Sequence, residues 1–178
     1  MRILGVDPGT WRTGVGVIES EGPKYRYLHC ESISVKSKIS LPPRLVQIHR
    51  ALCEIIQKFR PDILALENVF FGKDVQAMVK IGEARACAML AASASGLDVI
   101  EYPPARVKQS VTGNGRATKE QIQHMVKTLL SLKTLPENDS ADALAVAICH
   151  AHCYKNKKLE ARISNLGKHV RILDRKAD

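Results

Sequence analysis

Four acidic residues spread along the chain could together bind divalent metal ions. They are Asp7, Glu67, Asp139 and Asp142. Carboxylates that act without His or Cys ligands suit Mg²⁺ or Mn²⁺, since both ions prefer oxygen donors. Two such ions about 3.5–4 Å apart can activate a water and stabilise the leaving oxygen of a phosphodiester. This chemistry requires rigid elements that bring the four side chains together.

The first two acids stand at the ends of predicted strands. An apolar run over residues 3–6 ends at Asp7, and a second buried run over residues 62–67 ends at Glu67. A helical pattern over residues 43–59 lies between them, so the crossover predicts parallel pairing of the two strands. Parallel neighbours place their carboxyl ends at one edge of the sheet, where α/β proteins bind ligands.

The other two acids belong to a predicted last helix. It begins at Asn138 or Ser140 and ends near Tyr154, which puts Asp139 and Asp142 three residues apart in its first turn. Residues at this spacing share one helix face. If this helix packs beside the first strand, all four carboxylates converge.

The remaining pattern predicts one α/β domain. Further strands are expected over residues 14–18, 25–35 and 99–100, and further helices over residues 74–95, about 105–111 and 118–132. Antiparallel strands therefore come first and βα crossovers follow, which predicts a mixed five-stranded sheet flanked by helices. Thr118 and Gln121 have the spacing of a capping box at the start of the helix that ends near Leu132.

The charge of the chain suggests a polyanionic partner. Its 178 residues include 27 Lys and Arg against 18 Asp and Glu, a net charge of +9. Nucleic acid fits this excess, although charge alone does not distinguish such a protein from one that is merely basic. Residues 153–178 hold eight basic and three acidic residues, a net of +5. We expect a folded domain over residues 1–154 and a basic C-terminal tail of open function over residues 155–178.

The cysteines and the apolar runs indicate the compartment. Five scattered cysteines favour reduced thiols in a cytoplasmic protein over a disulfide framework. No apolar run is long enough to span a membrane, and no signal peptide is visible at the start. Cys149, His152 and Cys153 share a helix face, so zinc is conceivable, but no second Cys/His pair lies at zinc-finger spacing.

The segments that carry the acids resemble the RuvC family, the bacterial Holliday-junction resolvases. The matching segments are Gly5–Thr10 with Thr13 and Gly14, Leu66–Phe71, Tyr102–Gln109, Lys119–Val126 and Asp139–Ala145. They keep the family's order and spacing from residue 1 to about 153. The resemblance implies an RNase H-like fold, Mg²⁺-dependent endonuclease activity on four-way DNA junctions, a homodimer, and work alongside the RuvA and RuvB branch-migration proteins.

The resemblance also implies roles for individual residues. The four acids match the family's catalytic, metal-binding cluster; some relatives have His at the last position, where this chain has Asp142. Phe70 matches an aromatic residue that stacks on an unpaired base near the crossover. Lys108 and Lys119 match lysines near the scissile phosphate. They flank a flexible glycine-containing loop over residues 113–115, which could also present Arg116 to DNA.

Other interpretations of these residues stay open from the sequence alone. Asp7 before Pro-Gly could simply form a turn, Asp139 could favour a helix N-terminus, and Phe70 could fold back onto the core. The segment Asp7–Thr10 also resembles the phosphate loop of actin-like ATPases and sugar kinases, although 178 residues hold neither their second lobe nor a second glycine-rich loop. A non-catalytic junction-binding module is a third possibility, and unneutralised carboxylates that repel DNA argue against it. The Ala-rich helix over residues 74–95 is a candidate dimer interface.

Overall fold

The computed structural model describes residues 1–155 except residues 23, 36–38 and 69–74. The elements are β1 (Arg2–Asp7), β2 (Arg12–Glu21), β3 (Lys24–Ser34), α1 (Leu41–Phe59), β4 (Ile63–Glu67), α2 (Val75–Ala94), β5 (Asp98–Tyr102), α3 (Pro104–Thr112), α4 (Lys119–Leu129) and a last helix over residues 138–155, termed the C-terminal helix. This order of strands and helices confirms the one predicted from the sequence.

The strands form one mixed sheet in the order β3-β2-β1-β4-β5. β1, β2 and β3 pair antiparallel, as consecutive hairpin strands do. β4 pairs parallel with both β1 and β5, because α1 and α2 return the chain to the same end of the sheet before each strand. The predicted parallel pairing of the two acid-bearing strands is therefore confirmed.

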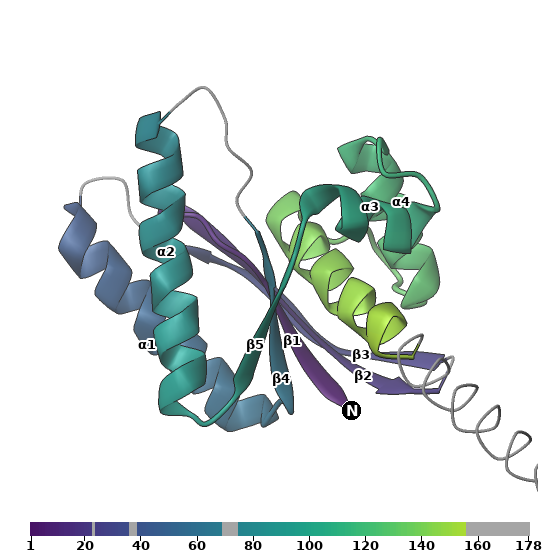
Figure 1. The fold of residues 1–178 in the computed structure, drawn as a ribbon, viewed down its shortest axis with the longest axis horizontal. Helices are drawn as coiled ribbons and strands as arrows, with labels where there is room; N and C mark the ends of the chain where they lie inside the picture. The colour runs from purple at the N-terminus through teal and green to yellow at the C-terminus, as the bar shows by residue number, and fades with distance from the viewer. Residues whose placement is uncertain (23, 36–38, 69–74, 156–178) are drawn as a thin grey trace, which may run out of the picture.

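Helices cover both faces of the sheet (Figure 1). Because side chains alternate along a strand, Leu4 and Val6 of β1 pack with α1 and α2, whereas Ile3 packs with α3, α4 and the C-terminal helix. Two buried apolar layers result, one on each side of the sheet. In the part of the chain that the structure describes, no helix has the length and apolar content needed to cross a membrane.

The C-terminal helix lies almost directly on the backbone of β1 and β2. A Cβ added to Gly14 would be 1.9 Å from the Asp139 carbonyl oxygen, and one added to Gly5 would be 2.1 Å from that of Ala143. Such distances are far below van der Waals contact, so only glycine permits this approach. The helix is thereby held at a closely defined position over the two strands.

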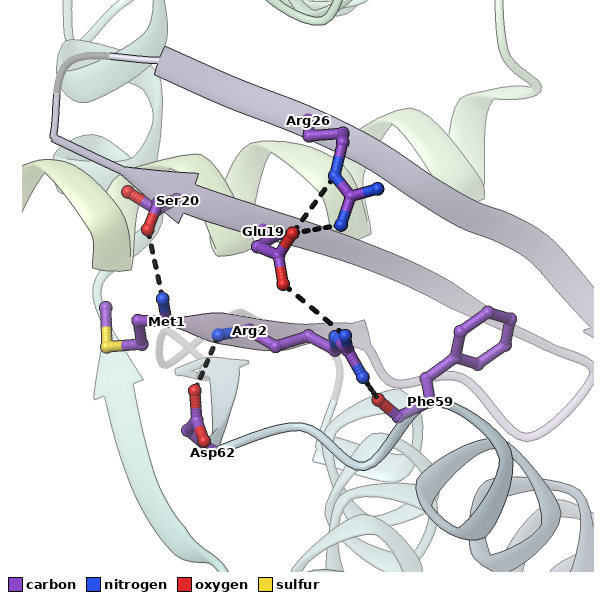
Figure 2. A network of polar contacts seen from close by, with 7 residues as sticks. All are labelled: Met1, Arg2, Glu19, Ser20, Arg26, Phe59 and Asp62. Atoms are coloured by element: carbon purple, nitrogen blue, oxygen red, sulfur yellow. Dashed lines mark hydrogen bonds and ion pairs between the residues drawn. The ribbon is translucent and has the colours of Figure 1, made fainter.

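A polar network fixes the amino end of β1 (Figure 2). The Arg2 backbone N–H donates to the Asp62 carboxylate at 2.7 Å, and the Arg2 guanidinium donates to the Phe59 carbonyl. The same guanidinium lies 3.4 Å from the Glu19 carboxylate, which also accepts from Arg26 on β3 and has a lowered pKa because of that hydrogen bond. The network joins three strands and the entry to β4 at the end of β1 remote from Asp7.

The capping box at the start of α4 is confirmed. The Thr118 hydroxyl accepts from the Gln121 N–H, and the Gln121 side chain accepts from the Thr118 N–H. α4 ends at Leu129, short of the expected end near Leu132, because Ser131 adopts a left-handed φ of 52°. A helix cannot continue through that backbone conformation.

We expect Gly14→Ala to lower the free energy of unfolding by about 1–3 kcal/mol or more, because its methyl group would overlap the Asp139 backbone. Urea denaturation of the purified protein measures this change. Gln57→Ala is the control, since Gln57 is exposed within α1, and it should be neutral or slightly stabilising. A Gly14→Ala protein as stable as the parent would contradict the close contact.

Candidate active site

The carboxyl ends of β1 and β4 place two of the acids side by side. Val6 and Leu66 are register partners in the parallel pair, and the next residues are Asp7 and Glu67, which end the two strands. Both are partly buried at the rim of the core. The prediction that strand ends bring these carboxylates together is confirmed.

The glycine contact brings the other two acids to the same edge. Asp7 pairs with Gly14 across β1 and β2, and Gly14 in turn lies against the backbone of Asp139. Asp139 and Asp142 are in the first turn of the C-terminal helix and are both partly buried. The helix therefore packs beside β1, as the sequence analysis required for the four acids to converge.

The acids act on one another electrostatically. Burial first, and then repulsion from Asp142 and Asp139, raises the pKa of Asp7 to about 7. Burial followed by repulsion from Asp7 and Asp142 raises the pKa of Glu67 to about 7 as well. Burial also raises the pKa of Asp142, and the nearby Asp139 adds to that rise. The carboxylates therefore share one site in which a cation would relieve their repulsion.

Basic residues line the same site. Lys119 Nζ lies 3.7 Å from Asp142 Oδ2, and its positive charge opposes the rise in the pKa of Asp7, Glu67 and Asp142. The charge of Lys108 acts in the same direction on Glu67 and Asp142. The structure therefore brings both predicted lysines to the acidic cluster.

The donor set suits a hard divalent cation. All four side chains offer oxygen atoms, the ligands that Mg²⁺ and Mn²⁺ prefer, and their mutual repulsion favours an added positive charge. Among the described residues, no three His, Cys, Asp or Glu side chains are close enough, as they stand, to hold a metal ion. The cluster fits the ion by chemistry and charge, and the carboxylates would move inward to ligate it.

The chain is similar to one family of known proteins over most of its length. A family model described as "Crossover junction endodeoxyribonuclease RuvC" matches residues 3–150. The chain belongs to the RuvC family. A RuvC from Geotalea uraniireducens (strain Rf4) is 47% identical over 152 residues, which cover 85% of this chain and 89% of that protein. As a member of this family the chain is a DNA endonuclease, so the ATPase and non-catalytic alternatives are set aside.

Solved structures confirm the predicted RNase H-like fold. "T. thermophilus RuvC in complex with Holliday junction substrate" has a TM-score of 0.84 and 35% identity, covering 88% of this chain and 96% of that one. The yeast mitochondrial Holliday junction resolvase Ydc2 has a TM-score of 0.67 at 10% identity, covering 94% of this chain and 85% of that one. The second likeness supports the fold alone.

The residues predicted to contact DNA fall into two groups. Lys108, Arg116 and Lys119 are described, and Arg116 is exposed on the loop before α4, where its backbone N–H donates to the Asn114 side chain. Phe70 and its neighbours in residues 69–74 lie outside the described residues, as does the predicted tail beyond Lys155. The stacking role of Phe70 stays a prediction.

The cysteines and the histidine near the end of the C-terminal helix contact residues of α3. The buried Cys149 thiol accepts from the Ser110 hydroxyl at 3.2 Å, and the Cys153 sulfur accepts from Arg106 at 3.6 Å. His152 Nδ1 is 3.2 Å from the Ser110 carbonyl oxygen. These side chains connect the helix to α3.

Two site residues were missed by the sequence analysis. Arg12 Nη1 lies 3.9 Å from Asp139 Oδ2, and the Ser32 hydroxyl donates to the same oxygen at 3.3 Å. Arg12 could have been found, because it directly follows the turn after Asp7. Ser32 could not, because its place depends on the pairing of Gly14 with Ser32 across β2 and β3.

Asp7→Asn should stabilise the metal-free protein at alkaline pH. A carboxyl whose pKa is raised from 3.8 to about 7 binds its proton more tightly in the folded state than in the unfolded state. Stability is therefore lost as the pH rises from about 4 through about 7, and the neutral amide does not incur this loss. We expect a melting temperature higher by on the order of 5 °C at pH 8 in EDTA, and no difference near pH 4.

Thermal unfolding across this pH range measures the effect. Asp98→Asn, at an exposed acid where β5 begins, is the control and should follow the parent at every pH. A less stable Asp7→Asn protein at pH 8 would show that the acids do not repel one another.

Proposed function

We propose that this chain resolves Holliday junctions as a Mg²⁺-dependent homodimer that nicks two opposite strands symmetrically. The proposal rests mainly on the cluster of partly buried carboxylates at one edge of the sheet. A bound cation would relieve their mutual repulsion, and the chain belongs to the RuvC family. The 35%-identical T. thermophilus RuvC, which is in complex with Holliday junction substrate, supports the choice of four-way DNA as the substrate.

Asp7, Glu67, Asp139 and Asp142 would hold the metal. Bound there, two Mg²⁺ ions, for which Mn²⁺ could substitute, supply an activated water for attack on the phosphodiester and positive charge for the departing 3′ oxygen, leaving 5′-phosphate ends. The strand ends and the glycine-packed helix bring the four acids to one edge of the sheet before the ion binds, and their side chains would then close around it.

Lys119, Lys108 and Arg116 would hold the DNA backbone beside the acids. Lys119 is 70% exposed at its side chain although it lies 3.7 Å from Asp142, so its ammonium can contact solvent-side phosphates as well. A phosphate group brings negative charge to an already acidic edge, and these cations offset that repulsion. Phe70 would stack on an unpaired base at the crossover, in accord with its match to the family pattern.

The outer face of α2 supports a homodimer. Val75, Val79 and Leu90 are 67%, 57% and 61% exposed, and their spacing places them on one stripe of the helix. The opposite stripe, which includes Ala84 and Ala88, is buried against the core. A helix that is apolar on both faces indicates a partner for the exposed one. A two-fold dimer would present two active sites to a junction that is itself two-fold.

The cellular setting completes the proposal. RuvA and RuvB would supply the branched substrate, as the family resemblance implies. All five cysteines are free, in accord with a reducing cytoplasm. The nuclease domain would span residues 1–154 and the basic tail residues 155–178.

The direct test of activity uses a synthetic four-way junction with Mg²⁺. The parent protein should cut two opposite strands, while Asp7→Asn should bind the junction and cut it about 100-fold or more slowly, because the metal-held site supplies several kcal/mol. Asp98→Asn should cut at the parent rate. EDTA should stop cleavage, and Mn²⁺ should restore it. Binding without cutting by the parent, or undiminished cutting by Asp7→Asn, would contradict the proposed mechanism.

The dimer has a separate test. Leu90→Glu places a charge in the exposed stripe of α2, so we expect the dimer to dissociate and paired nicking to be lost. Light scattering after size-exclusion chromatography gives the mass of each variant. Leu135→Glu, at a residue 44% exposed outside α2, should leave the mass unchanged. A Leu90→Glu protein with the parent mass would exclude this face as the interface.

A further inference from the structure

Trp11 is an exposed aromatic side chain in the turn that follows Asp7. It is the chain's single tryptophan, and 45% of its surface is accessible. It lies in the turn between Asp7, which ends β1, and Arg12, which begins β2 and reaches the Asp139 carboxylate. The backbone of this turn therefore lies at the edge of the sheet where the acids converge.

The turn that carries Trp11 is fixed. The Trp11 carbonyl accepts from the Val35 N–H at 3.1 Å, and the Thr13 hydroxyl donates to the Gly9 carbonyl at 2.7 Å. Thr10, the residue before Trp11, is buried. An aromatic ring on such a backbone loses little conformational entropy when a ligand binds to it.

Arg44 of α1 supports the ring. Its guanidinium carbon is 3.7 Å from the centroid of the Trp11 ring, a cation–π contact between elements far apart in the sequence. Arg44 Nε and Nη1 are buried and find no hydrogen-bond acceptor among the described residues. The guanidinium packs on the ring and adds positive charge beside the exposed indole.

These features match what single-stranded or unpaired DNA requires. Binding surfaces for such DNA combine cations, which attract the backbone, with aromatic faces on which bases stack. Arg12 and Arg44 supply the cations and Trp11 the aromatic face. A paired base in a duplex already has neighbours on both faces, so only a base freed near the crossover could stack on the indole.

We propose that Trp11, backed by Arg44, is a stacking site for an unpaired nucleobase of the junction. This inference rests on the proposed junction-cutting function and adds a DNA contact from the turn between β1 and β2. The site would hold the displaced base against the turn and α1, whereas the predicted lysines lie on α3 and α4.

Tryptophan fluorescence tests the proposal directly, because the chain has a single indole. The Asp7→Asn protein is titrated with an unlabelled four-way junction, while the anisotropy of a labelled junction reports binding independently. Stacking should quench the Trp11 emission as the junction saturates the protein. A junction with abasic sites at the crossover should bind but leave the emission unchanged, and a linear duplex of the same sequence should not quench it.

Variants separate stacking from a structural role of the ring. Trp11→Ala in the same background should weaken junction binding roughly tenfold, whereas Trp11→Phe should keep most of the affinity because a face for stacking remains. Tyr27→Ala, at a 37%-exposed aromatic residue on β3, is the matched control and should bind within about twofold of its parent. Melting temperatures show whether each variant is folded at the assay temperature.

The outcomes distinguish the inference from the function on which it rests. If the junction binds by anisotropy and Trp11 emission stays unchanged, or if the abasic junction quenches equally, the stacking site is wrong while the junction-binding function stands. Equal loss of binding in Trp11→Ala and Trp11→Phe would also overturn it. If no junction binds at all, the proposed function fails and this inference fails with it.

Discussion

The close contact between the C-terminal helix and the backbone of β1 and β2 decides where half of the acidic cluster lies. Gly5, Gly14 and Gly16 face this helix without side chains, so the helix can approach until its own backbone touches the strands. Asp7 pairs with Gly14 across β1 and β2, and Gly14 contacts the backbone of Asp139. Gly14 therefore brings together two acids that are far apart in the sequence. Any larger residue at these positions would lift the helix and carry its acids away from the strand ends.

This packing holds together groups that repel one another. Burial and mutual repulsion raise the pKa of Asp7 and Glu67 to about 7, which means that the metal-free folded state is less stable than it would be with neutral residues there. Lys119 and Arg12 offset part of the repulsion. The polar network around Arg2 joins the strands at the other end of β1, away from the strained edge. The acidic cluster therefore destabilises the metal-free fold at one end of β1, and the Arg2 network stabilises the sheet at the other end.

Much of the fold and half of the site could be predicted from the sequence. Asp7 and Glu67 end apolar runs joined by a helix, and parallel strands of this kind share an edge, so local pattern was sufficient. The position of Asp139 and Asp142 could be predicted only on the condition that their helix packs beside β1. That packing depends on the glycine contact, which the periodicity of the sequence does not show. Two further contacts join segments far apart in the chain, that of Trp11 with Arg44 and that of Ser32 with Asp139. Both depend on strand register and helix packing, which the sequence pattern does not show. Phe70 lies outside the described residues, so its role rests on the family pattern.

The central claim is that four carboxylates from β1, β4 and the C-terminal helix form one divalent-metal site. Anomalous diffraction from crystals soaked in Mn²⁺ tests it most directly, because the metal positions are then located independently of the protein coordinates. The account predicts anomalous peaks among the carboxylate oxygens of Asp7, Glu67, Asp139 and Asp142, and their loss in Asp7→Asn crystals. Strong peaks elsewhere in the protein, with none at this edge of the sheet, would contradict it.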